Sequence, residues 1–237
     1  MVHLRCPHRR RVRPHPAARR APHRRAGRRA DRGAGRPAGP GVSSRRDLAA
    51  RILDATFAEV AAHGLGALTV EAVAVRAGTS RATLYRHVPG GRDELIARTI
   101  EREVERFFGA VMDSVPLPST GVVDHVAGIV VAAQRLLGEH DVLQRLLVEE
   151  ADAIVPSLAT VQPLVARGLA RHLTATLGDA AGRGELRPDV DVDEAGDHAA
   201  RLVLSYVGSP GGWDLDDPDE ARRLVRDRIL AGVVPEG

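Results

Sequence analysis

Apolar residues recur at helical spacing through most of this 237-residue chain, and that periodicity limits the fold more than any other feature. Leu48, Ile52 and Ala55 follow i, i+4, i+7 spacing in a first helix that ends near Gly64. From Arg45 onward no segment alternates apolar and polar residues as a strand does. The sequence therefore predicts an all-α fold.

Further helices follow to the C-terminus. A charged helix with one apolar face is predicted at about 93–113, and a helix that is apolar on most sides, hence central and buried, at 122–137. Another stripe covers 195–206, after the candidate N-caps Asp191 and Asp193. The last helix has the clearest start, with Asp217 as N-cap, Pro218 at the first helical position and Glu220 at the third.

Prolines divide the middle of the chain. Pro116 and Pro118 end the charged helix. At Gln162–Pro163, either a fresh helix starts or a helix begun at Ser157 is kinked, and we expect the break.

The charge is unevenly distributed behind a net value of +3. Residues 1–44 hold 13 Arg against one acid, residues 45–92 hold 7 Arg against 4 acids, and residues 93–237 hold 14 Arg against 26 acids. A basic N-terminal part and an acidic C-terminal part indicate that only the N-terminal part binds an anionic polymer, with nucleic acid as the first candidate.

Residues 1–44 contain six prolines, five glycines and no apolar periodicity, which predicts disorder. This segment is either a basic arm that adds phosphate contacts, a solvated tail, or an extension from a start codon upstream of a true start at Val42, and we favour the last two. His3, Cys6 and His8 are too few ligands in too basic a tail for a metal site. We expect no metal and no cofactor.

Cys6 is the only cysteine, so no internal disulfide can form and a cytoplasmic location is the default. No stretch has the ~18 uninterrupted apolar residues of a membrane helix, and the start lacks an apolar signal region. We expect no membrane partner.

The most informative stretch is Thr69–Leu95, which predicts two short helices joined by a tight turn. Thr69 caps the first helix, Gly78 supplies a positive φ in the turn, and Ser80 opens a second helix through His87. Such a second helix enters the major groove N-terminus first, so residues 80–83 are expected nearest the bases.

This stretch resembles the DNA-binding domain of the tetracycline-repressor (TetR) family of bacterial transcription regulators. The resemblance rests on the following residues: Thr69, Val73-Ala74, Ala77-Gly78, Thr83-Leu84-Tyr85-Arg86-His87 and Leu95. The chain departs from the family at the start of the fourth helix, where Arg92 replaces a common Lys and follows an extra glycine in Pro89-Gly90-Gly91.

The resemblance implies specific DNA contacts. Tyr85 and His87 would hold phosphates, and Arg81 would read a base edge, with guanine as the expected base. Hydroxyl contacts would come from Thr79, Ser80 and Thr83, and the set is completed by Thr69, Ala82, Arg86 and Arg92. Two alternatives stay open: Tyr85 as a half-buried packing residue, and Arg86 in solvent rather than on phosphate.

After the basic arm (1–44), the resemblance implies two domains: a helix-turn-helix domain (45–92) and a helical effector-binding and dimerisation domain (93–237). A homodimer would form through Leu202, Val203, Tyr206, Leu224, Val225 and Ile229, although these stripes equally suit an ordinary core. Candidate effector contacts are Phe108, Met112, His125, Gln134, His172 and Thr176. Because aromatic residues are few, a lipophilic or acyl-type effector is favoured.

We therefore expect a ligand-responsive repressor that binds an inverted-repeat operator in double-stranded DNA as a homodimer. A constitutive architectural DNA-binding protein is the alternative, although the acidic C-terminal part argues against it. A helical enzyme is more remote. Asp189, Asp191 and Asp193 lack the Gly and Glu of a calcium loop, and Gly208-Ser209 lacks the spacing of a nucleophile elbow, so we expect no catalytic residues.

Overall fold

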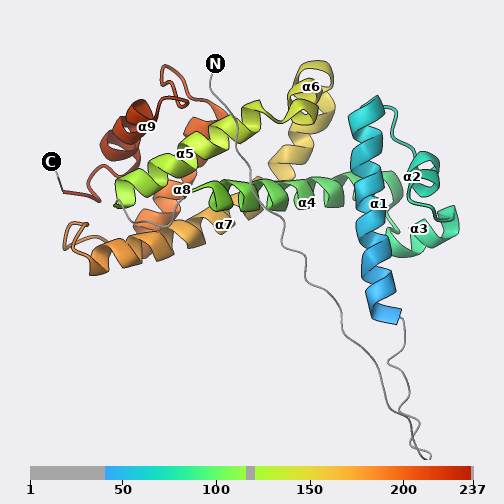
Figure 1. The fold of residues 1–237 in the computed structure, drawn as a ribbon, viewed down its shortest axis with the longest axis horizontal. Helices are drawn as coiled ribbons and strands as arrows, with labels where there is room; N and C mark the ends of the chain where they lie inside the picture. Colours follow the sequence, from blue (N-terminus) through green and yellow to red (C-terminus); the bar gives the residue numbers. More distant parts are fainter. Residues whose placement is uncertain (1–40, 116–120, 236–237) are drawn as a thin grey trace, which may run out of the picture. The chain divides into compact units, whose positions relative to one another are not determined.

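The computed structural model describes residues 41–115 and 121–235, where the regular elements are all helices (Figure 1). Contacts divide the chain between Gly39 and Pro40, so all described residues belong to the second unit. The helices are α1 (Gly41–His63), α2 (Val70–Arg76), α3 (Arg81–His87), α4 (Gly91–Ser114), α5 (Val122–Gly138), α6 (Asp141–Glu149), α7 (Ala151–Gly182), α8 (Val192–Gly208), α9 (Pro218–Leu224) and the π-helical η1 (Val225–Ile229). The all-α prediction is confirmed.

Some sequence predictions fall outside the described residues. These are the arm over residues 1–40, the rejected metal ligands within it, and the break at Pro116 and Pro118. The predicted end of the arm at residue 44 is wrong, because α1 already begins at Gly41. No residue between Gly41 and Arg45 is a proline, so nothing in this stretch stops a helix.

The head, which we define as residues 41–90, folds around side chains from its three helices. Ile52 of α1, Val73 of α2 and Leu84 of α3 are all fully buried, and Leu95 at the start of α4 closes this core. Burial of a large aliphatic side chain contributes about 1.5–3 kcal/mol, so these four residues hold the short helices α2 and α3 in place. Helices of seven residues would not persist alone.

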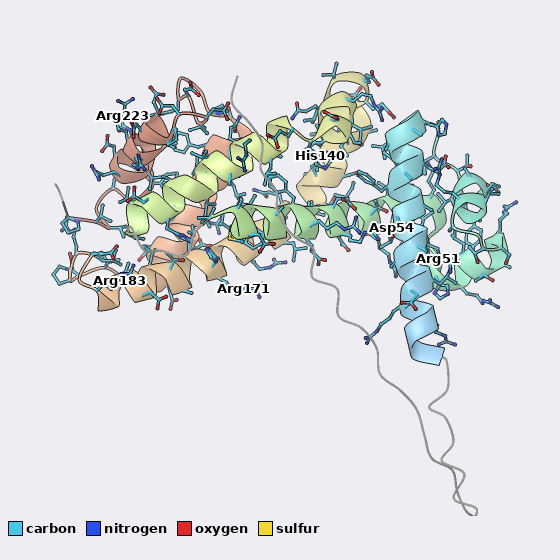
Figure 2. The ribbon with its side chains drawn as sticks, viewed as in Figure 1. Arg51, Asp54, His140, Arg171, Arg183 and Arg223 are labelled. Atoms are coloured by element: carbon cyan, nitrogen blue, oxygen red, sulfur yellow. The ribbon has the colours of Figure 1, made fainter. Side chains whose placement is uncertain are left out.

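Helix α4 joins the head to the body, which we define as residues 91–115 and 121–235, and it runs on from the head between α5 and α7 in Figure 1. Arg102 of α4 donates to the Ala50 carbonyl (3.0 Å) and to Asp54 (2.8 Å), both on α1. Arg106 reaches the same carboxylate at 3.2 Å. Asp54, labelled in Figure 2, thus ties α1 to two successive turns of α4.

The body packs around α5, as its apolar sequence predicts. Val126, Ile129 and Val130 are at most 2% exposed, and α5 contacts α4, α6, α7, α8, α9 and η1. Asp191 and Asp217 form the predicted caps, because Asp191 accepts from two backbone amides of α8 and Asp217 accepts from the amide of Asp219. Asp193, the other candidate cap, lies within the first turn of α8. Glu220 instead accepts from the Asp214 amide at 2.7 Å, three residues before the cap.

The expected break at Gln162–Pro163 is wrong, because α7 runs unbroken through Pro156 and Pro163. A proline removes one backbone hydrogen bond, to the carbonyl four residues earlier. Here both prolines and those two carbonyl-bearing residues lie on exposed positions, where water replaces the lost partner. The opposite face buries Ile154, Val161 and Leu169, and this packing keeps the helix continuous.

The apolar stripes near the C-terminus, for which a dimer interface and an ordinary core were the two interpretations, largely form core. Leu224, Val225, Ile229 and Val203, expected at a dimer interface, are 0–2% exposed within the single chain and belong to the body core. Side chains with so little exposed surface contribute little to a contact with a second copy. The reason is that α9 is short and lies against α5, which buries its apolar side internally. Leu202 and Tyr206 remain partly exposed.

Helix α7 leaves much of its apolar surface uncovered. Val155 is 51% and Leu164 41% exposed. Among the described helices, α7 alone is long and apolar enough to cross a membrane, with a mean hydropathy of 1.3 and 17% of that window buried. This is weak evidence for a membrane span, because core helices of soluble proteins pass the same test.

Candidate nucleic-acid interface

The turn between α2 and α3 is built as the sequence predicts. Thr69 accepts from the Ala72 amide at 3.1 Å and caps α2. Gly78 has a φ of +64°, which reverses the chain, and the Thr79 amide bonds the Ala74 carbonyl at 3.0 Å. From α1, Arg51 (labelled in Figure 2) donates to the Ala77 carbonyl at 2.9 Å. The angle between α2 and α3 is therefore held by backbone and side-chain bonds together.

The start of α3 holds a small hydrogen-bond network. The Ser80 hydroxyl accepts from the Thr83 amide (3.1 Å) and donates to the Thr83 hydroxyl (3.0 Å). Arg86 also donates to that hydroxyl at 3.0 Å. Because Thr83 accepts from both, its own proton remains available as a donor. Ser80 and Ala82 are exposed, whereas Thr79 and Thr83 are partly buried.

Arg81 lies at the first residue of α3 and pairs with a carboxylate of α2. Its Nη2 atom is 2.7 Å from Glu71 Oε1, and the two side chains are 61% and 52% exposed. Exposed ion pairs are worth about 0–1 kcal/mol, so a competing base or phosphate can displace Glu71. The pair aligns Arg81 beside the N-terminus of α3 without locking it.

Tyr85 combines an exposed edge with a packed one. It is 42% exposed, and its ring lies against Gly91, where a Cβ atom would come within 3.3 Å of the ring. Gly91 also has a φ of +62°. Gly91 therefore meets two requirements, a positive φ and a close approach to Tyr85. His87 is partly buried, and its carbonyl accepts from Arg98 of α4 at 3.1 Å.

Arg92, which is predicted to contact DNA, also forms hydrogen bonds within the protein. Its Nε donates to the Leu68 carbonyl (3.1 Å) and its Nη2 to the Leu65 carbonyl (2.6 Å). It also lies 3.6 Å from Asp93, and its side chain is 41% exposed. Arg92 thus fastens the loop between α1 and α2 to α4, with part of the guanidinium left at the surface.

The head contains a buried carboxylate that the sequence analysis does not single out. Glu59 of α1 is 9% exposed and bonds Arg76 of α2 at 2.5 Å and His63 at 3.1 Å. The hydrogen bond from Arg76 lowers the pKa of Glu59, against the opposing effect of its burial. The i, i+4 spacing of Glu59 and His63 is a local signal, but the contact with Arg76 depends on the tertiary fold.

The six predicted effector residues lie in the body. Phe108 and Met112 at the end of α4 are partly buried against its core. His125 of α5 and His172 of α7 meet with their Nε2 atoms 3.1 Å apart, and Thr176 donates to the His172 carbonyl at 3.0 Å. Burial, and secondarily the charge of His125, lowers the pKa of His172.

Gln134, the sixth of these residues, has a buried Oε1 atom with no hydrogen-bond partner among the described residues. Three cavities in the described part of the chain lie elsewhere, between α1, α4, α6 and α7, between α7 and α8, and beside α5 and α9. None of the six side chains lines any of these three cavities.

Comparisons with known proteins agree with this geometry. The family model described as bacterial regulatory proteins, tetR family, matches residues 52–99. An uncharacterized HTH-type transcriptional regulator of Mycobacterium bovis is 33% identical over 133 residues, which cover 56% of this chain and 68% of that protein.

Two solved structures share the fold. The transcriptional repressor QsdR of R. erythropolis, from the TetR family, is 22% identical with a TM-score of 0.54, over 84% of this chain and 99% of that one. SmeT of Stenotrophomonas maltophilia, in complex with triclosan, is 24% identical with a TM-score of 0.53, over 81% and 93%. Because the family model matches the helix-turn-helix and the mycobacterial regulator is 33% identical over 68% of its own length, the chain belongs to the TetR family of bacterial transcriptional regulators.

Proposed function

We propose that the protein is a ligand-responsive repressor that binds an inverted-repeat operator as a homodimer. The observation that carries this proposal is the N-terminal end of α3, where Arg81 and the hydroxyl groups of Ser80 and Thr83 cluster at exposed or partly exposed positions. An α-helix presented in this way fits the major groove.

The side chains of the head divide into two roles. Arg81 carries the fork of donors that suits the O6 and N7 atoms of guanine, so it reads the base sequence. Tyr85, Arg86 and His87 lie further along α3 and hold phosphates, as do Thr69, Thr79 and the exposed part of Arg92. Ala82 contributes an apolar contact suited to a thymine methyl group.

Dimerisation is assigned to the surface of α7 and α8. These two helices form the most extensively packed pair in the described chain, yet Val155 and Leu164 of α7 stay exposed, and Leu202 and Tyr206 of α8 stay partly exposed. Apolar surface left open on one chain favours a twofold contact with another. A dimer would place two heads on the two halves of a palindromic operator.

Effector release completes the proposal. SmeT, which has this fold, forms a complex with triclosan, and we propose that the present chain also binds a small lipophilic molecule. A ligand releases DNA only if it binds one geometry of the dimer more tightly than the other. The protein would act in the bacterial cytoplasm, on the nucleoid, without catalytic residues.

The test compares two substitutions in α3. Arg81→Ala is expected to reduce discrimination at one base pair per half-site by roughly 1–3 kcal/mol. Tyr85→Phe removes one phosphate-facing hydroxyl and is expected to weaken binding to every DNA sequence equally. Fluorescence anisotropy on the promoter fragment and single-base variants measures both, with light scattering to establish the dimer. A monomer that shows no preference for its own promoter over unrelated DNA would refute the proposal.

A further inference from the structure

A cavity of about 230 Å³ lies where the head meets the body. Its walls are almost wholly apolar and come from α1, α4, α6 and α7, with the loop after α1 and the end of α5. Among the lining residues are Phe57 and Val60 of α1, Ile100 and Phe107 of α4, Leu143 of α6 and Ile154 of α7. The first helix of the DNA-binding head therefore forms one wall of a ligand-sized space.

Two polar side chains in this lining, those of Thr99 and His140, can form a hydrogen bond with a ligand. Thr99 is 6% exposed, and its hydroxyl has no hydrogen-bond partner in the described part of the chain. A buried hydroxyl without a partner is costly, so a ligand that supplies one gains affinity. Thr56, which also lines the cavity, differs because its hydroxyl already donates to the Ile52 carbonyl at 2.8 Å.

His140 supplies a second polar group where α5 passes into α6 (Figure 2). Its Nδ1 atom accepts from the Leu143 amide at 3.2 Å, so in the neutral ring the proton lies on Nε2, which is then a donor. The ring packs edge to face on Phe57, with the centroids 6.4 Å apart. The remaining polar side chain of the lining, Glu103, is paired with Arg106 at 2.9 Å. The cavity thus combines aliphatic and aromatic walls with four polar side chains, and its one carboxylate is already neutralised.

The residues around the cavity also attach the head to the body. Arg145 of α6 donates to the Val60 carbonyl (3.1 Å) and the Ala61 carbonyl (2.7 Å) at the end of α1. Glu150, between α6 and α7, accepts from the amides of Leu65 (2.9 Å) and Gly66 (2.6 Å). Val60 and Leu65 line the cavity themselves, so anything that moves its walls also strains these attachments.

From this arrangement we infer that the cavity between head and body is the effector site, and that it takes a compact neutral apolar molecule with one hydroxyl or carbonyl group. The inference rests on the proposed function. It places the effector site away from the six effector residues predicted from the sequence. A ligand wedged between α1 and α4 changes the angle of the head directly, because its contacts with Phe57 and Ile100 lie on opposite sides of the joint. DNA affinity changes because only one head orientation accommodates the ligand.

The experiment measures binding of the neutral fluorescent probe N-phenyl-1-naphthylamine to the full chain, with 1-octanol and toluene as competitors. Leu143→Trp fills the cavity, and Leu147→Trp is its matched control on the same helix, because Leu147 is 37% exposed and lies outside the lining. Leu143→Trp is expected to weaken probe binding at least tenfold, while Leu147→Trp stays within twofold of the unsubstituted chain.

A second variant tests the polar contact even if the tryptophan variant fails to fold. Thr99→Val keeps the side-chain shape and removes the hydroxyl, so 1-octanol is expected to compete about three- to tenfold less well while toluene is unaffected. Without ligand, Thr99→Val is expected to keep or raise the thermal midpoint, because the lost hydroxyl had no partner. Equal effects of both tryptophan variants, or unchanged competition by 1-octanol, would overturn the site.

Titrations of the promoter fragment with and without ligand test this inference and the proposed function separately. Saturating 1-octanol is expected to shift the promoter affinity of the unsubstituted chain at least fivefold and that of Leu143→Trp not at all. If the ligand binds as described and the chain ignores DNA, the proposed function fails and the ligand site stands. If ligand and DNA bind independently, the cavity is not the effector site.

Discussion

Removal of the carboxylate that pairs with Arg81 is expected to tighten DNA binding. In the free protein, Glu71 Oε1 lies 2.7 Å from Arg81, and Arg81 must leave this partner to reach a base. Both side chains are more than half exposed, so we assign the pair about 0.5 kcal/mol. A dimer carries two such pairs, and their loss in Glu71→Gln amounts to about 1 kcal/mol, or about fivefold in affinity.

Anisotropy titration of the promoter fragment at fixed salt measures this gain. Glu105→Gln is the matched control, because it removes an exposed carboxylate of α4 outside the head. The decisive comparison repeats Glu71→Gln in an Arg81→Ala background, where the gain is expected to vanish. A gain that persists without Arg81 would show that Glu71 acts on phosphates by repulsion, and an absence of any gain would refute the role of the pair.

Three other perturbations test the head. Gly78→Ala places a Cβ at a φ of +64° and is expected to cost about 1–2 kcal/mol by chemical denaturation, whereas Gly109→Ala, with no atom within 4 Å of the new Cβ, is expected to stabilise α4. Because the pKa of Glu59 is lowered in the folded state, ionised Glu59 adds to the free energy of unfolding above the ordinary titration range of glutamate, and this stabilisation is lost as the pH falls through the folded pKa. Glu59→Gln is therefore expected to flatten the loss of stability at acid pH. An unchanged loss of stability in this variant would exclude Glu59 as its source. Deletion of residues 1–40 is expected to reduce the slope of log affinity against log salt and leave operator preference intact, so a loss of preference would mean that the segment reads bases.

The helix-turn-helix was predictable because its signals are local. Thr69 and Ser80 are N-caps in the structure as in the sequence, and Gly78 has the positive φ that the turn required. Each of these features involves residues within a few positions of one another. The fold class followed from the same kind of signal, repeated helix by helix.

The errors arose where distant segments decide the outcome. A helical stripe shows that a face is apolar but not what covers it. The sequence therefore allows either a partner chain or the core to cover Leu224 and Ile229, and in the structure α5 and the rest of the body cover them. The predicted break at Pro163 considers only the backbone hydrogen bond that a proline removes. In the structure the packing of Val161 and Leu169 outweighs that loss and keeps α7 continuous. The cavity between head and body draws its walls from segments far apart in sequence, and no local pattern marks it.

Footprinting of the protein on the DNA upstream of its own gene tests the central claim most directly. The account predicts two protected half-sites related by an inverted repeat, with centres roughly 34–36 Å or a multiple of that apart, and protection that fades as salt is raised. It also predicts that Arg81→Ala loses preference for these half-sites while it still binds DNA. Continuous protection without regard to sequence, unchanged by Arg81→Ala, would contradict the account and indicate an architectural DNA-binding protein.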